Sequence, residues 1–303
     1  MAGNLQFSML RSFKDAAAGH EGVLSDEMGG VLAKCCHDSE VSFYESIAEH
    51  PDFGRWLPTY LGTLATDGRN IDIRFKQAVV LENITHGFTR PCVLDVKLGS
   101  LLTDDETSEQ KRLRLEKVAR ETTSWPLGIR LTGMRVWKED RNDYQIYPGE
   151  YGKSLTTDSI QSGLAEFFAS GLSTEHRELV IRRFIEDVSE IQALLNDQEL
   201  RMFSASILMV YEGDSTTIRA ALENERERLK ELDKAIDSPR TENGSLGDIE
   251  DDNEPTPNKV TECKMIDFAH AKWTPGEGPD QNVLKGVRSL LSLLEAVQRG
   301  VNE

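Results

Sequence analysis

An aspartate and a lysine stand two residues apart in the apolar segment PCVLDVKLG, residues 91–99. Side chains on a β-strand alternate between the two faces of the sheet, so Asp95 and Lys97 would project from one face. Leu94, Val96 and Leu98 would then project from the other face. A carboxylate and an ammonium on one surface can carry chemistry, but they can also form an internal ion pair that holds two strands together.

A second acidic residue with apolar neighbours is Asp267, in the late segment MIDFAH, residues 265–270. Phosphoryl transfer needs a carboxylate to hold the metal ion that bridges phosphate oxygens, and an aspartate in this setting is typical of kinase metal sites. The alternative interpretation is an aspartate at the end of a strand that caps the following turn.

Lys34 ends a predicted hairpin, and Glu40 lies in the helix predicted to follow it. Such a pair positions ATP phosphates in protein-kinase-like folds, although for Lys34 taken alone a solvated lysine at a strand end is the favoured interpretation. The order of these residues along the chain, with Asp95, Lys97 and Asp267 after them, favours a kinase. No Walker A motif, Gly-x-Gly-x-x-Gly motif or His-Arg-Asp motif is present, which disfavours P-loop proteins, Rossmann dinucleotide binders and protein kinases proper.

Residues 91–99 match the pattern Pro-x-x-x-Asp-x-Lys-x-Gly, and through it the sequence resembles the inositol polyphosphate kinase family. The resemblance covers nearly all of the chain except an acidic segment, residues 238–257. Residues 81–86 and the short segment after Gly99 resemble the multikinase branch most, particularly its fungal members. The segments that carry the resemblance are GHEGVL, GGVLAK, FYESI, LENITHGFTRPCVLDVKLG, TTSWPLGIRLTGMRVW, YGKSLT, SILMVYEG and MIDFAHA.

This resemblance implies roles for individual residues. The ATP-binding residues would be Lys34, Glu40, Glu82, Ile84, Asp95 and Asp267, with the backbone of Glu82 and Ile84 at the adenine. Asp95 and Lys97 would be catalytic, and Asp267 would hold the metal ion. The substrate phosphates would be bound by Lys97, Lys111, Arg114 and Lys117, with His270 and Lys153 as weaker candidates. The family's Ser-Ser-Leu-Leu run is replaced by Ala-Ser-Ile-Leu at residues 205–208, which leaves only Ser206 for a hydroxyl near the metal.

The activity that the resemblance implies is an ATP- and Mg²⁺-dependent kinase that phosphorylates hydroxyls of soluble inositol polyphosphates, from trisphosphate to tetrakis- and pentakisphosphate. Two alternatives stay open. One is an inositol hexakisphosphate kinase that makes pyrophosphates. The other is a scaffold for transcription-factor partners in which catalysis is dispensable. The expected location is the nucleus and cytoplasm.

The sequence patterns and the resemblance together predict a two-lobed α+β fold, protein-kinase-like and of the ATP-grasp type. Residues 1–88 would form a small β-rich N-lobe with the ATP-phosphate lysine and the hinge, and residues 89–303 a larger, mixed and helix-rich C-lobe with the substrate and metal sites. Period-two and 3.6-residue patterns predict the elements. The predicted strands are 23–24, 31–32, 71–81, 92–98 and 129–137, and the predicted helices are 39–47, 107–120, 158–170, 175–199, 222–236 and 286–301.

Charge and composition exclude several classes of protein. The 303 residues include 35 basic and 52 acidic ones, a net charge of −17, so direct nucleic-acid binding is not expected. The predicted helix 107–120 is nevertheless locally basic.

Residues 238–257 are acidic and nearly free of apolar side chains, which predicts a disordered insertion. The longest apolar run, residues 207–211, is too short to span a membrane. The first twenty residues lack a secretory signal and no Cys-x-x-Cys pair occurs, so we expect the four cysteines in a reducing compartment.

Overall fold

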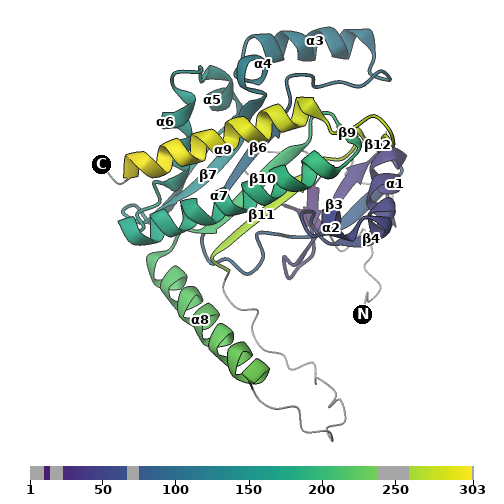
Figure 1. Ribbon diagram of the computed structural model, residues 1–303. Coiled ribbons are helices and arrows are strands. Elements are labelled where there is room, and N and C mark those ends of the chain that lie inside the picture. The colour runs from purple at the N-terminus through teal and green to yellow at the C-terminus, as the bar shows by residue number, and fades with distance from the viewer. Residues whose placement is uncertain (1–9, 14–22, 67–74, 238–258, 302–303) are drawn as a thin grey trace, which may run out of the picture.

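The computed structural model describes residues 10–13, 23–66, 75–237 and 259–301 (Figure 1). The first of two five-stranded sheets has the order β1-β2-β3-β5-β4, and all of its strand pairs are antiparallel. Its strands are β1 (Arg11–Ser12), β2 (Val23–Ser25), β3 (Val31–Cys36), β4 (Tyr60–Ala65) and β5 (Gln77–Glu82).

The second sheet has the order β11-β10-β6-β7-β8 and is also antiparallel throughout. Its strands are β6 (Pro91–Leu98), β7 (Ile129–Lys138), β8 (Asp143–Tyr147), β10 (Ser206–Glu212) and β11 (Thr261–Ile266). A further pair joins β9 (Leu200–Met202) to β12 (Ala271–Trp273). The strand β6 lies at the centre of its sheet, so both of its edges are paired and its residues are held rigidly.

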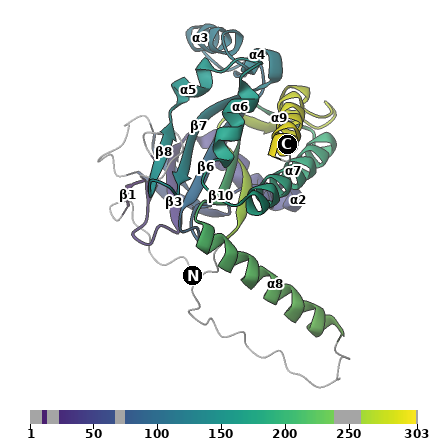
Figure 2. The same cartoon turned by 90° about the vertical axis from the view of Figure 1, so that its left-hand side faces the viewer.

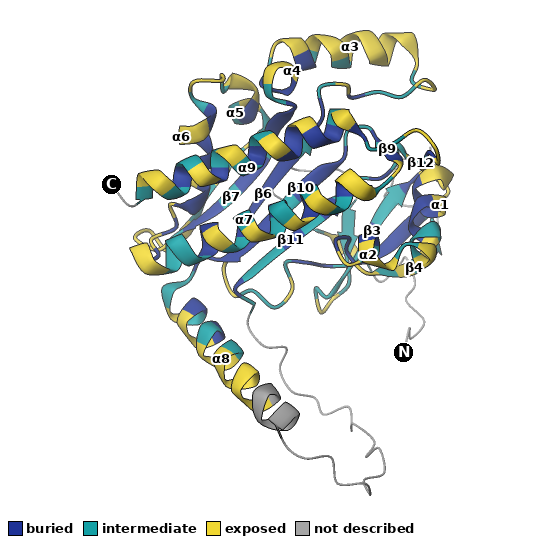
Figure 3. Ribbon diagram, in the orientation of Figure 1, coloured by how far each residue is buried: buried dark blue, intermediate teal, exposed yellow. Residues whose placement is uncertain are grey.

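Two long helices, α7 (Thr174–Asp197) and α9 (Gln281–Val301), lie side by side across one face of the second sheet (Figures 1 and 3). Their buried residues recur every three or four positions, as in Val283, Val287, Leu290 and Leu294 of α9. Full burial of one such side chain stabilises a fold by about 1.5–3 kcal/mol. This stripe therefore fixes the helix against the sheet from which the candidate site is built.

The remaining helices surround the two sheets. The helix α8 projects from the body in both views (Figures 1 and 2). The shorter elements are α1 (Asp38–Ser46), α2 (Pro51–Gly54), α3 (Glu109–Arg120), α4 (Ser124–Leu127), α5 (Gly149–Ser154) and α6 (Ile160–Ala165), with 3₁₀ turns at Ile47–Glu49 and Glu166–Phe168, and α8 spans Ser215–Asp237. No helix in the described part of the chain is long and apolar enough to cross a bilayer.

The structure confirms the predicted α+β class with a β-rich N-terminal part and a helix-rich remainder, but several boundaries differ. The strand predicted from residue 71 begins at Gln77, and residues 71–74 lie outside the described part. The helix predicted over 158–170 ends at Ala165 and continues as a tighter 3₁₀ turn. The helix predicted from Gly286 begins at Gln281. The predicted insertion 238–257 lies outside the described residues.

Candidate active site

The strand β6 presents Asp95 and Lys97 as the alternation predicts, since Leu94, Val96 and Leu98 on the other face are fully buried. One irregularity accompanies this arrangement. The pairing with β7 shifts between Asp95 and Val96, and the hydroxyl of Thr132 donates to the carbonyl oxygen of Asp95 at 3.1 Å. A bulge of this kind re-aims the side chains beside it, and bulges are common next to active sites.

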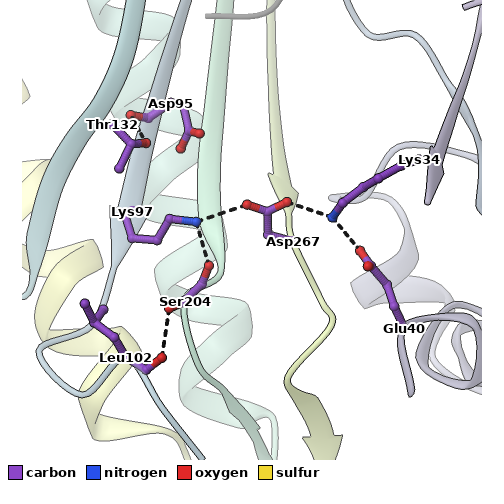
Figure 4. Close-up of polar contacts among 8 residues, drawn as sticks. All are labelled: Lys34, Glu40, Asp95, Lys97, Leu102, Thr132, Ser204 and Asp267. Atoms are coloured by element: carbon purple, nitrogen blue, oxygen red, sulfur yellow. Dashed lines mark hydrogen bonds and ion pairs between the residues drawn. The ribbon is translucent and has the colours of Figure 1, made fainter. Parts of the chain in front are cut away.

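Asp267 lies at the centre of the charged cluster, just after β11 ends at Ile266 (Figure 4). Its backbone is in the left-handed region, with φ of 70°. The two carboxylate oxygens turn in different directions: Oδ1 lies 2.8 Å from the Lys34 ammonium, and Oδ2 lies 3.0 Å from the Lys97 ammonium. Lys34 and Lys97, which precede Asp267 by 233 and 170 positions in the chain, therefore share its carboxylate.

Lys34 connects this cluster to the first sheet and to α1. Its ammonium lies 2.7 Å from Oε1 of Glu40, whose side chain is only 2% exposed. Burial alone would lower the pKa of Lys34, but Asp267 and Glu40 outweigh it and the pKa is raised. The ammonium thus stays charged at physiological pH. The strand β3 continues to Cys36, so Lys34 lies within the strand and not at its end.

Ser204 was not singled out in the sequence, yet it contacts Lys97 directly. Its carbonyl oxygen accepts a hydrogen bond from the Lys97 ammonium at 2.8 Å, and its own hydroxyl donates to the carbonyl of Leu102 at 2.9 Å (Figure 4). Ser204 also has a left-handed backbone, with φ of 59°, which costs a non-glycine residue energy. Ser206, the residue expected to supply a hydroxyl, is fully buried opposite Lys97 in the strand pairing.

A pocket extends from this cluster between the two sheets. Lys34, Asp95 and Asp267 line its charged end, whereas apolar side chains line the rest, namely Val23, Leu32, Leu81, Ile84, Val93 and Leu208. Glu82 also lines the pocket, and its carboxylate accepts a hydrogen bond from the Thr59 hydroxyl at 2.8 Å. Burial would raise the pKa of Glu82, but this bond and Lys259 lower it. A slot with an apolar end and a charged end that holds one lysine and two aspartates suits a nucleotide, whose base is flat and whose phosphates are bound together with a metal ion.

The basic helix α3 brings one of its predicted residues to the turn after β11. The Lys111 ammonium lies 3.4 Å from Nε2 of His270. Lys117 lies elsewhere, with its ammonium 3.8 Å from Glu121 and its side chain 72% exposed. A three-residue spacing drifts by about 60° per step around a helix, so Lys117 is about 120° away from Lys111. Arg114 is exposed, and Lys153 pairs with Glu150 at 3.6 Å.

The comparison with protein families decides where this arrangement belongs. The family model described as inositol polyphosphate kinase matches residues 78–295, which include Asp95, Lys97, the helix α3 and Asp267. The chain belongs to this family.

Two curated relatives of this inositol polyphosphate kinase chain are fungal. The inositol polyphosphate multikinase of Saccharomyces cerevisiae is 30% identical over 93% of this chain and 97% of its own length. That of Schizosaccharomyces pombe is 30% identical over 93% and 96%. Human inositol hexakisphosphate kinase 1 is 27% identical over 84% of this chain, but the match covers only 59% of its own length.

A solved structure of the S. cerevisiae inositol phosphate multikinase, in complex with ADP and Mn²⁺, superposes on this inositol polyphosphate kinase chain with a TM-score of 0.67. The two are 29% identical, and the match covers 88% of this chain and 99% of that one. This similarity confirms the predicted fold class.

Proposed function

We propose that the chain is an inositol polyphosphate multikinase, which transfers a phosphoryl group from ATP to hydroxyls of a soluble inositol polyphosphate with Mg²⁺ as the metal ion. The observation that carries this proposal is the position of Asp267 between the ammonium groups of Lys34 and Lys97, at the charged end of an otherwise apolar pocket. The two fungal multikinases, which match over nearly the whole length of both chains, support it.

The donor set fits a metal ion that is bound together with a nucleotide. Asp267 offers hard carboxylate oxygens, and in the described part of the chain no group of three or more acidic, histidine or cysteine side chains could hold a metal by itself. Mg²⁺ typically takes one or two carboxylates and completes its shell with water and substrate phosphates. When bound, it would neutralise charge on the phosphate oxygens. The ADP and Mn²⁺ in the solved relative support a divalent ion and a nucleotide.

In this proposal the protein acts by positioning and neutralising charge, because phosphoryl transfer has a loose transition state. Lys34, held by Glu40, would contact the ATP phosphates, and the backbone of Glu82 and Ile84 would meet the adenine. Lys97 would neutralise the phosphoryl group in transit, and Asp95 would orient the acceptor hydroxyl. Lys111 and His270 would bind substrate phosphates, with Arg114 beside them. Residues 1–88 and 89–303 would form the two lobes around this pocket.

The pyrophosphate-forming alternative has weaker support, because the hexakisphosphate kinase match spans a smaller part of that enzyme. The transcription-factor partners and the nuclear and cytoplasmic location stay predictions.

The test is to incubate purified protein with ATP and Mg²⁺, and with either inositol 1,4,5-trisphosphate or inositol hexakisphosphate, and to resolve the products by ring position. We expect tetrakis- and pentakisphosphates from the trisphosphate. Pyrophosphate products from the hexakisphosphate, with no turnover of the trisphosphate, would favour the alternative enzyme. Turnover of neither compound would refute the proposal.

A further inference from the structure

The loop between β6 and α3 carries an acidic residue, Asp104, that holds a side chain of the proposed substrate site. Oδ2 of Asp104 lies 2.5 Å from Nδ1 of His270, and Oδ1 accepts a hydrogen bond from the Thr107 hydroxyl at 2.6 Å. The Asp104 side chain is 16% exposed and that of His270 is 31% exposed. Burial alone would raise the pKa of Asp104, but the bonds from Thr107 and His270 lower it. The group that faces the imidazole is therefore a carboxylate.

An ionised carboxylate has no proton to donate, so Nδ1 of His270 must carry the hydrogen of this contact. Asp104 thereby fixes both the tautomer and the plane of the ring. The opposite nitrogen, Nε2, lies 3.4 Å from the ammonium of Lys111. In many sites, a carboxylate that accepts from one ring nitrogen of a histidine orients the other nitrogen for its function. Here the partner directs Nε2 toward the cation of the substrate helix.

The contact between Asp104 and His270 also joins two separate parts of the chain. His270 lies three residues after Asp267, on the turn between β11 and β12, and its carbonyl oxygen accepts a hydrogen bond from the backbone of Phe203 at 3.1 Å. Asp104 precedes α3 and is anchored to Thr107, at the approach to that helix. The contact therefore links α3 to the turn that carries Asp267.

We propose that Asp104 is a positioning residue for substrate recognition: it holds His270 so that Nε2 accepts from the Lys111 ammonium, whose other N–H groups then donate to one phosphate group of an inositol polyphosphate. This inference rests on the proposed function. It assigns no chemistry to Asp104, which acts only through His270.

Simple electrostatics predicts the opposite effect, and this makes the proposal testable. A carboxylate near a polyanion repels it, so removal of that charge should tighten binding. Asp105 is the adjacent residue, has the same charge and is exposed. Asp105→Asn is thus a matched control for the long-range effect of the lost charge. Asp104→Asn removes the charge and also leaves a single amide oxygen in place of the two oxygens that accept from Thr107 and His270.

We expect Asp104→Asn to raise KM for inositol 1,4,5-trisphosphate about tenfold, equivalent to ~1.4 kcal/mol and within the range for an intramolecular hydrogen bond. KM for ATP and kcat should stay within about twofold of the wild type, because the nucleotide contacts lie elsewhere. Asp105→Asn should leave KM for the trisphosphate unchanged or slightly lower it. A KM that falls equally in both variants would overturn the inference.

A second measurement detects the protonation of the His270 ring and does not depend on enzymatic turnover. In ¹⁵N-histidine spectra, assigned by comparison with His270→Gln, the wild type should show a protonated Nδ1 that is altered by Asp104→Asn and unaltered by Asp105→Asn. Identical spectra in all three would overturn the inference. If Asp104→Asn fails to fold, Thr107→Val provides a second test. It keeps both Asp104 and His270 but removes the hydroxyl that anchors Asp104, so it should raise KM for the trisphosphate by a smaller factor.

The outcomes separate the two proposals. An active wild-type kinase in which Asp104→Asn and Asp105→Asn behave alike would refute the role of Asp104 and leave the proposed function intact. A wild type that phosphorylates no inositol polyphosphate would refute the proposed function, and the substrate role of Asp104 with it.

Discussion

Replacement of Asp267 by asparagine tests the arrangement most directly, because this carboxylate contacts both lysines of the site. Asparagine keeps the shape of the side chain but removes its charge, and one of its two terminal atoms becomes a donor. It can no longer accept from both ammonium groups, nor offer a carboxylate to a metal ion. Asp267→Asn should therefore affect both the stability of the free protein and metal-dependent turnover.

The size of each effect can be worked out from the contacts. A hydrogen bond to a charged group contributes about 1.5–3 kcal/mol. Two such bonds are weakened, but Lys34 keeps Glu40 at 2.7 Å, Lys97 keeps the Ser204 carbonyl at 2.8 Å, and the amide oxygen still accepts one bond. The free energy of unfolding should thus fall by about 1–3 kcal/mol. Metal ions supply several kcal/mol of transition-state stabilisation, so kcat should fall roughly a thousandfold or more.

The assay is turnover of inositol 1,4,5-trisphosphate across a Mg²⁺ titration, together with chemical denaturation. Asp214→Asn is a suitable control, because Asp214 accepts hydrogen bonds from the backbone of Thr216 and Thr217 at the start of α8. That variant should lose less than about 1 kcal/mol of stability, because the amide oxygen of asparagine can still accept these hydrogen bonds, and it should keep its turnover. A fully active Asp267→Asn enzyme with the wild-type dependence on Mg²⁺ would refute the proposed site.

Three further changes test other parts of the structure. Lys97→Met should abolish phosphoryl transfer and keep the fold, as measured by product formation and circular dichroism; near-normal activity would contradict its role. Burial and the nearby Glu190 and Glu262 raise the pKa of Asp187 to about 6, so the contribution of Asp187 to wild-type stability should fall as the pH rises from about 4 to 6. Asp187→Asn should remove that decline and gain about 1–2 kcal/mol at pH 7, after allowance for solvent screening; an unchanged pH profile of unfolding would count against it. Gly286→Ala would place a Cβ 2.3 Å from the Gly128 carbonyl oxygen and should cost about 2–4 kcal/mol in denaturation, whereas Gly300→Ala in the same helix meets nothing within 4 Å and should be neutral or stabilising.

Local patterns in the sequence were sufficient for much of the fold. The alternation in β6 identified the shared face of Asp95 and Lys97, and the 3.6-residue pattern identified α7 and α9. These signals are local because they depend on the geometry of one element. The family resemblance placed Asp267, Lys34 and Glu40 in one site, and the structure brings them together.

Other features depend on contacts that no local pattern contains. The left-handed backbone of Ser204 lies in the link between β9 and β10, and a serine gives no signal for this conformation. The bulge beside Asp95 depends on how β6 pairs with β7, which the sequence of one strand does not contain. Asp104 looked like one of several acidic residues in a loop, because its partner lies 166 residues away. Lys117 lies about 120° around α3 from Lys111, because two three-residue steps add up along a helix, and its role as a substrate ligand stays a prediction.

The shared carboxylate of Asp267 has a consequence for the order in which ligands arrive. In the free protein the two lysines and the two acids Asp267 and Glu40 already neutralise one another. A nucleotide that came without a metal would draw the lysines toward its phosphates and leave Asp267 facing those phosphates as an uncompensated anion. A nucleotide that carries a divalent ion brings the replacement partner for Asp267 with it. Metal and nucleotide should therefore each strengthen the binding of the other, with equal coupling in both directions.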